Sequence, residues 1–323
     1  MKFTNIPKNG ASWGGELRYS FATELDEPSN VVVVVRDADT NEELGEMRLY
    51  SVTEGTVDIA PIVRRQVSIA QPSTNYPTII FSRSVVRVVV EVEGVASPAV
   101  SLFRSSYTPS LFKVLSSMSN AEGVAIGDTL RYTVNVVGDI VVTAKEFVGG
   151  KSRQIANLSF SALSQIVEVI VPIASLSKDA DKVTVTISSG AVSKSSEYRV
   201  VERTAGSRTL LWYNSRGGIE RYAFPYSRQL SRTADVTTVK TLSDRVARLN
   251  SAESRVRLSS ALLSLTEQER LSEIILSPYL FEDVAGKVSE VELASRDINY
   301  DQHGALQRLS LDIVEEWKGG KLW

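Results

Sequence analysis

The sequence contains no cysteine and a single histidine, His303. The missing cysteines exclude disulfide frameworks, thiolate zinc sites and cysteine nucleophiles. His303 would have to serve any serine–histidine–acid triad, yet it lies in a turn-like stretch, and no serine stands in a nucleophile-elbow setting. We therefore expect a protein that is not an enzyme, with no catalytic residues, no metal site and no cofactor.

Long hydrophobic runs and a strong excess of one charge are also absent. No apolar stretch approaches the length of a membrane span, and residues 1–7 lack the apolar core of a signal peptide. The formal net charge of −2 argues against a protein built to hold nucleic acid. We expect no membrane span, no nucleic-acid partner, and a protein that is cytoplasmic at synthesis.

One stretch imitates the start of a calcium-binding loop. Asp37, Asp39 and Asn41 alternate along the chain as calcium ligands do. Glu42, however, stands where the sharp bend needs glycine, and Arg48 stands where the bidentate glutamate belongs. The stretch therefore predicts an ordinary hairpin turn.

What the sequence does contain is a repeat. Residues 15–21 (GELRYSF) return, one residue longer, at 127–134 (GDTLRYTV). The later matching pairs are 31–36 with 140–145, 57–61 with 169–172, and 85–93 with 183–188. β-Branched residues alternate along these segments, which is typical of strands with one buried face. The chain is thus predicted to be mostly β, with two tandem immunoglobulin-like β-sandwiches at 1–103 and 104–203.

Three local features refine this prediction. Residues 64–84 form a long connection without a counterpart in the second module, and we expect a loop with a function there. Gly149 and Gly150 predict a hairpin turn. Serine-rich stretches at 116–119 and 188–196 predict loops.

Residues 204–323 predict an α+β domain that serves assembly. Two short strands flank a glycine turn, and Thr266 with Glu269 forms a capping box for one helix, which Pro278 ends. Residues 201–260 carry eleven basic and five acidic side chains, whereas 261–323 carry six basic and twelve acidic. Either these two halves face each other in the fold, or they form a charged docking surface for an identical neighbour.

The strongest local pattern is an aromatic hairpin at residues 212–224. Its candidate binding residues are Trp212, Tyr213, Arg216, Arg221 and Tyr222. In one interpretation the aromatic side chains fill the core of the domain while the glycines supply positive φ. In the other they form a platform for a sugar or a protein, with the two arginines at its rim.

This hairpin, of the form W-x-N-x-x-G-G-[ID]-x-x-Y-x-F, resembles one in structural proteins of Bacteroidetes phages and prophages. There, as here, a helix ending in LSPY (276–279) follows, and then a closing strand pair, here 288–293 and 306–313. The resemblance covers about residues 208–317. It implies a virion or tail-associated part.

Together these features favour a non-enzymatic structural protein of a phage or phage-derived particle. Its expected partners are itself or other particle proteins, and its expected final location is the virion or particle. The alternative is an adhesin or carbohydrate-binding multi-domain protein, which would bind a surface glycan through the 64–84 loop or the Trp212 hairpin. An enzyme would require carboxylates from distant strands to converge in a pocket.

Overall fold

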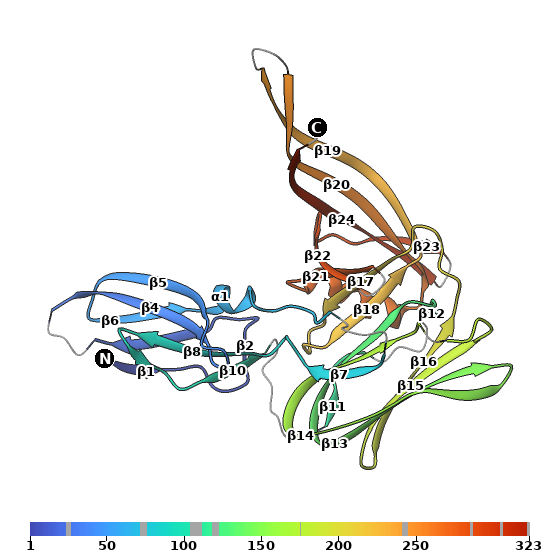
Figure 1. Ribbon diagram of the computed structural model, residues 1–323, viewed down its shortest axis with the longest axis horizontal. Coiled ribbons are helices and arrows are strands. Elements are labelled where there is room, and N and C mark those ends of the chain that lie inside the picture. Colours follow the sequence, from blue (N-terminus) through green and yellow to red (C-terminus); the bar gives the residue numbers. More distant parts are fainter. Residues whose placement is uncertain are drawn as a thin grey trace.

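The computed structural model describes residues 1–23, 27–71, 76–103, 112–117, 123–174, 176–240, 245–284, 287–303 and 306–321. It is mostly β, as predicted, with several sheets that form sandwich-like domains (Figure 1). No helix within these residues is both long and apolar enough to cross a membrane.

The first sandwich has two sheets. Its strands are β1 (Lys2–Asn5), β2 (Ala11–Ser12), β3 (Arg18–Ala22), β4 (Ser29–Asp37), β5 (Glu43–Val52), β6 (Glu54–Asp58), β8 (Val86–Val92), β9 (Val95–Ala96) and β10 (Val100–Phe103). The smaller sheet has the order β1-β3-β6, and the larger has the order β2-β10-β8-β4-β5 with β9 beside β8. Alternate valines of β4 and β8 are buried between the sheets. A short helix, α1 (Ala60–Arg64), follows β6.

The second part is one seven-stranded sheet. Its strands are β7 (Thr78–Phe81), β11 (Lys113–Val114), β12 (Gly123–Val124), β13 (Thr129–Val148), β14 (Lys151–Pro172), β15 (Lys182–Ser189) and β16 (Val192–Val200). The order is β12-β16-β15-β13-β14-β7, with β11 beside β13. The predicted turn at Gly149 and Gly150 is confirmed, with φ of 54° and 81°.

The repeat in the sequence coincides with a repeat in strand pairing. Tyr19 of β3 faces Val57 of β6, and the matching Tyr132 of β13 faces Val169 of β14. β4 lies between β5 and β8, just as the later half of β13 lies between β14 and β15. The two repeats differ in one respect. In the first, β3 and β4 are separate strands, whereas in the second the single strand β13 continues past a bulge at Gly138 and provides the counterparts of both.

One loop prediction is wrong in part and another is wrong. The 64–84 connection contains β7, which pairs with β14 and so adds a strand from the first module to the second sheet. The 188–196 stretch is the end of β15 and most of β16. Its serines suit an exposed strand face, where Ser195 and Thr186 share a hydrogen bond of 3.0 Å between hydroxyls.

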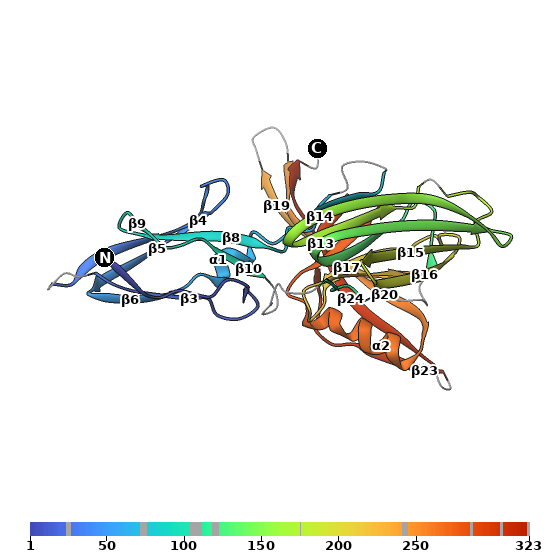
Figure 2. The same cartoon turned by 90° about the horizontal axis from the view of Figure 1, so that it is seen from below.

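The third part has eight strands in one sheet. They are β17 (Arg208–Tyr213), β18 (Ile219–Phe224), β19 (Tyr226–Lys240), β20 (Arg245–Leu263), β21 (Leu280–Val284), β22 (Lys287–Leu293), β23 (Asn299–His303) and β24 (Leu306–Lys321). Their order is β18-β17-β21-β22-β24-β20-β19, with β23 beside β24. Figure 2 shows the helix α2 (Leu265–Ser272), followed by a 3-10 turn (Glu273–Leu276), against one side of this sheet.

The N-cap of the helix lies two residues earlier than predicted. Ser264 is its N-cap and forms the capping box with Glu267, so the proposed cap at Thr266 is wrong. The Ser264 backbone N–H and hydroxyl both donate to Glu267 Oε2, at 2.9 and 2.7 Å. Leu271 and Ile274 are fully buried, as their helical spacing predicts.

The opposite charges of the last third do face each other. Arg257 Nε and Nη2 donate to the two carboxylate oxygens of Asp312, at 2.7 and 3.0 Å. Arg208 lies between Glu282 and Glu315 and forms ion pairs with both. Basic side chains of 201–260 thus pair with acidic ones of 261–323, as the first of the two interpretations predicts.

Candidate functional site

The aromatic hairpin β17–β18 lies at the centre of the molecule and is buried on both faces. Leu210 and Trp212 pack into the core of the third sheet, with β20, β24 and α2. Leu211 and Tyr213 point the other way, into the cluster that includes the core of the first sandwich. Because neighbouring side chains of a strand alternate between faces, one hairpin joins two hydrophobic cores.

The turn of this hairpin fits tightly against the second part of the chain. Asn214 Oδ1 accepts hydrogen bonds from the backbone N–H groups of Arg216 (2.9 Å) and Gly218 (2.8 Å), while its Nδ2 donates to Leu115 O at 2.9 Å. A Cβ on Gly218 would lie 2.4 Å from the carbonyl carbon of Leu115. The glycine is therefore required by the close approach of two backbones.

Polar groups continue this contact on both sides of the turn. Ser116 Oγ donates to Ile219 O at 2.6 Å and accepts from the backbone N–H of Thr133 at 2.8 Å. The hydroxyl of Thr133 in turn accepts from the backbone N–H of Ile219 at 2.9 Å. The backbone N–H and C=O groups of Ile219 are thus bonded to hydroxyls of the second part of the chain, as burial demands.

Glu220 is the central carboxylate of this junction and is 1% exposed. Its Oε1 accepts from the backbone N–H of Ser117 (2.6 Å) and from Asn214 Nδ2 (2.5 Å), and its Oε2 lies 3.7 Å from Arg270 Nη1 of α2. Burial raises the pKa of Glu220 to about 7, although Arg270 and these donors oppose the shift. One carboxylate therefore links the second part, the hairpin and the helix.

A second acidic side chain, Asp128, anchors the other end of the contact. Its carboxylate forms ion pairs with Arg203 and with Arg221 of β18, and it also accepts from the backbone N–H of Ala125 at 2.9 Å. Asp128 and Arg221 are both nearly buried. The arginine side chain that was predicted to rim a binding platform is instead held inside the junction.

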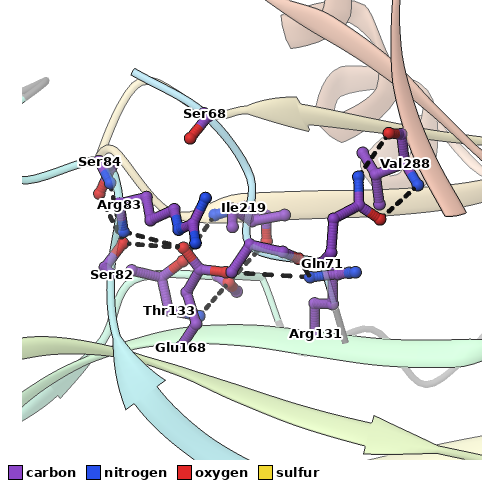
Figure 3. Close-up of polar contacts among 12 residues, drawn as sticks. Ser68, Gln71, Ser82, Arg83, Ser84, Arg131, Thr133, Glu168, Ile219 and Val288 are labelled. Atoms are coloured by element: carbon purple, nitrogen blue, oxygen red, sulfur yellow. Dashed lines mark hydrogen bonds and ion pairs between the residues drawn. The ribbon is translucent and has the colours of Figure 1, made fainter. Parts of the chain in front are cut away.

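The 64–84 connection, called the excursion from here on, also contacts the junction (Figure 3). Tyr213 Oη donates to Ser68 O at 3.0 Å. The side-chain amide of Gln71 bonds both backbone groups of Val288, with Nε2 donating to the carbonyl at 2.6 Å and Oε1 accepting from the N–H at 2.9 Å. The amide acts like a strand neighbour of β22, and fastens the first module to the third.

Below the excursion lies a fully buried pair of opposite charges, Arg131 and Glu168 (Figure 3). Their nearest ion-pairing atoms are 3.9 Å apart, while Arg131 Nη1 donates to Ala70 O at 2.7 Å and Ser82 Oγ donates to Glu168 at 3.1 Å. Burial raises the pKa of Glu168 and lowers that of Arg131, each opposed by the other charge. Each charge thus depends on the other and on the excursion above it.

The five predicted binding residues are all at this junction, but none offers an open aromatic face. Trp212 and Tyr213 are 0% exposed and Tyr222 is 5% exposed. Only Arg216 is at the surface, and it donates to Ser117 Oγ at 2.9 Å. The placement matches the interpretation in which the aromatic residues fill a core, and a ligand of the hairpin would have to displace the second part of the chain.

The calcium-like stretch forms the predicted hairpin turn. Asp37 Oδ1 accepts from the backbone N–H groups of Asp39 and Thr40, and Asn41 has a φ of 59°. These bonds hold the pKa of Asp37 below its ordinary value despite partial burial. No group of three His, Asp or Glu side chains that could hold a metal ion occurs among the residues described. The side chain of His303 lies outside them.

No family model and no curated protein matches this chain. Among solved structures, native Escherichia coli alpha-2-macroglobulin is similar over 97% of this chain and 20% of its own, at 9% identity and a TM-score of 0.22. The eight N-terminal Ig domains of Down syndrome cell adhesion molecule match over 98% of this chain and 53% of theirs, at 10% identity and 0.21. An endo-fucoidan hydrolase matches over 80% and 41%, at 9% identity and 0.16.

This chain therefore spans less than two thirds of each of these three proteins. At such TM-scores the similarities carry no argument about function. What remains is the geometry of the junction. Its charged and amide side chains bond to one another and to backbone groups of different parts, and this arrangement can hold the three parts of the chain together.

Proposed function

We propose that this chain is a non-enzymatic structural protein that works by protein–protein assembly in a phage or phage-derived particle. It would consist of two immunoglobulin-like sandwiches that arose by duplication, and an assembly domain. The particle is suggested by the resemblance of residues 208–317. The repeated pairing of Tyr19 with Val57 and of Tyr132 with Val169 supports the duplication.

The junction suits such a role because it connects the three parts of the chain and limits their relative movement. Glu220, Asp128 and Gln71 each connect different parts of the chain through hydrogen bonds or ion pairs. Linkers between ordinary tandem domains leave them free to move. A base with shared cores and buried charges would transmit force and keep an attached surface in one orientation.

The observation that carries the proposal is the ribbon of β19, β20 and β24. Val256 and Ile313 are buried, but the ladder continues from there to the pairs Lys240–Arg245 and Arg248–Lys321. Residues 228–233 of β19 are exposed on both faces. In Figure 1 the ribbon extends away from the rest of the molecule. A ribbon of few strands that is exposed on both faces along 228–233 is marginally stable in water, which suits a segment that packs on another chain.

Shortening the ribbon tests the proposal. Thr233 and Glu253 face each other in the ladder, so residues 234–252 can be replaced by Asn-Gly, which closes a two-residue hairpin. We expect light scattering to show self-association of the full chain and a monomer for the shortened one. As a control for folding, the two proteins should have the same unfolding temperature in calorimetry. A full chain that stays monomeric at millimolar concentration, or a shortened one that associates equally well, would contradict the proposal.

A further inference from the structure

A cleft of about 590 Å³ lies where the first sandwich meets the second sheet. It lies beside the buried Arg131–Glu168 pair, because Ser82 lines the cleft and bonds to Glu168. Its volume is within the size range of small-ligand sites, which are frequent at domain boundaries. Side chains from the first sandwich, from the 64–84 excursion and from β14 line it. Those that matter below are Asn9, Asp39, Phe81, Arg87, Ser101 and Gln165.

Phe81 presents an aromatic ring to this cleft. The side chain is 61% exposed, and its ring meets Phe160 edge to face with 6.0 Å between centroids. The backbone is fixed, because Phe81 faces Val167 in the β7–β14 ladder and the next residue, Ser82, is bonded to buried Glu168. An exposed ring on so rigid a support costs little entropy when a ligand stacks on it.

Polar side chains also line the cleft. Asn9 Oδ1 accepts a hydrogen bond from the backbone N–H of Ser101 at 2.9 Å. This bond uses only the oxygen, so the two amide hydrogens of Asn9 can be donated to a ligand. The exposed side-chain amide of Gln165 has no hydrogen-bond partner within the described parts of the chain. Asp39 and Arg87, which also line the cleft, form an ion pair, and the Asp37 turn holds Asp39 in place.

We propose that this cleft binds a neutral oligosaccharide. The charges of Asp39 and Arg87 cancel, and the carboxylate would repel a phosphate or another anion. A pyranose ring has an apolar C–H face that packs on an aromatic ring, whose face is weakly negative. Its vicinal hydroxyls match the amides and the carboxylate–guanidinium pair, which donate and accept in fixed planes. This inference is independent of the proposed assembly function, because the cleft lies within one chain and a monomer would bind the sugar equally well.

The test is titration of the full chain with four neutral probes: cellohexaose, laminarihexaose, mannohexaose and chitohexaose. Saturation-transfer NMR detects contact and calorimetry gives the affinity. We expect at least one probe to bind, and Phe81→Ala to weaken it by about tenfold or more, since the stacking ring is lost. Phe81→Trp should retain binding. Tyr50→Ala is the control, because Tyr50 is 70% exposed on β5 and does not line the cleft.

Gln165→Ala provides a second variant that changes only an exposed side chain and should weaken the same probe. Binding of none of the four probes would overturn the proposal, as would binding that Phe81→Ala leaves unchanged. An extended peptide of alternating threonine and valine serves as a competing probe for the edge of β7. If it binds while the sugars do not, the cleft is a peptide site and the proposal is wrong.

Discussion

Replacing Glu220 by glutamine should alter how the stability of this protein depends on pH. The buried carboxyl has a pKa of about 7, above its ordinary value of 4.5, so the folded chain favours the protonated form. A raised carboxyl pKa contributes stability that is fully present below pH 4.5 and is lost as the pH rises through 7. Glutamine has the shape of the neutral acid, and it keeps an oxygen that accepts from Ser117 and Asn214.

The size of the effect follows from the shift. One pKa unit corresponds to about 1.4 kcal/mol, so ionising Glu220 in the folded chain costs on the order of 3 kcal/mol at pH 8 or above. The variant Glu220→Gln should therefore be more stable than the natural chain at pH 8.5, and nearly equal to it at pH 5. The difference between the two proteins isolates Glu220 from all other titrating groups.

Urea unfolding of both proteins between pH 5 and 8.5 measures this difference. Glu269→Gln, on the exposed side of α2, is the matched control and should follow the natural chain at every pH. The reasoning is refuted if Glu220→Gln and the natural chain keep a constant difference across this range. It is also refuted if the variant loses stability relative to the natural chain as the pH rises.

Two further substitutions test the junction by urea unfolding. Gly218→Ala should lower the free energy of unfolding by several kcal/mol, because its Cβ would overlap the backbone of Leu115. Gly15→Ala is the control and should cost little, since a Cβ there has nothing within 4 Å. Equal effects of the two substitutions would contradict the close approach. Arg131→Met should cost about 3–5 kcal/mol because it leaves the buried Glu168 charge alone, and adding Glu168→Leu should recover much of that loss; a double variant as unstable as the sum of its parts would argue against the pairing.

The strands of the repeat were predictable because their signal is local. A run of valines marks β4, apolar and polar residues alternate along the earlier half of β13, and glycine at 149 and 150 marks the turn between β13 and β14. Tertiary contacts did not need to be known. The exposed strand β19 gave no such signal, because neither face of residues 228–233 is buried.

The buried charges could not be predicted from the repeat. Arg18 and Arg131 occupy matching positions, yet Arg18 has a 62% exposed side chain and Arg131 a fully buried one. The difference arises because the excursion from the first module covers Arg131, and β7 brings Ser82 to Glu168. Which strand edge a distant segment will cover depends on the assembled fold, and no local pattern reports it.

The candidate residues of the hairpin were identified, but their surroundings were not. The apolar and aromatic residues of β17 indicated burial, whereas the charges at Glu220 and Arg221 are typical of an exposed strand face, although both are buried. Their burial depends on Ser117 and Asp128, which are far away in the sequence. The cleft at Phe81 had a weaker signal, a single aromatic residue at the end of a short apolar run.

The central claim is that the buried polar junction makes the three β parts one cooperative body. Scanning calorimetry of the natural chain and of the Gly218→Ala variant measures this cooperativity most directly. We expect a single transition for the natural chain, and for the variant a separation into two, because its hairpin no longer seats against residues 115–116. Two or three separate transitions in the natural chain would contradict the claim.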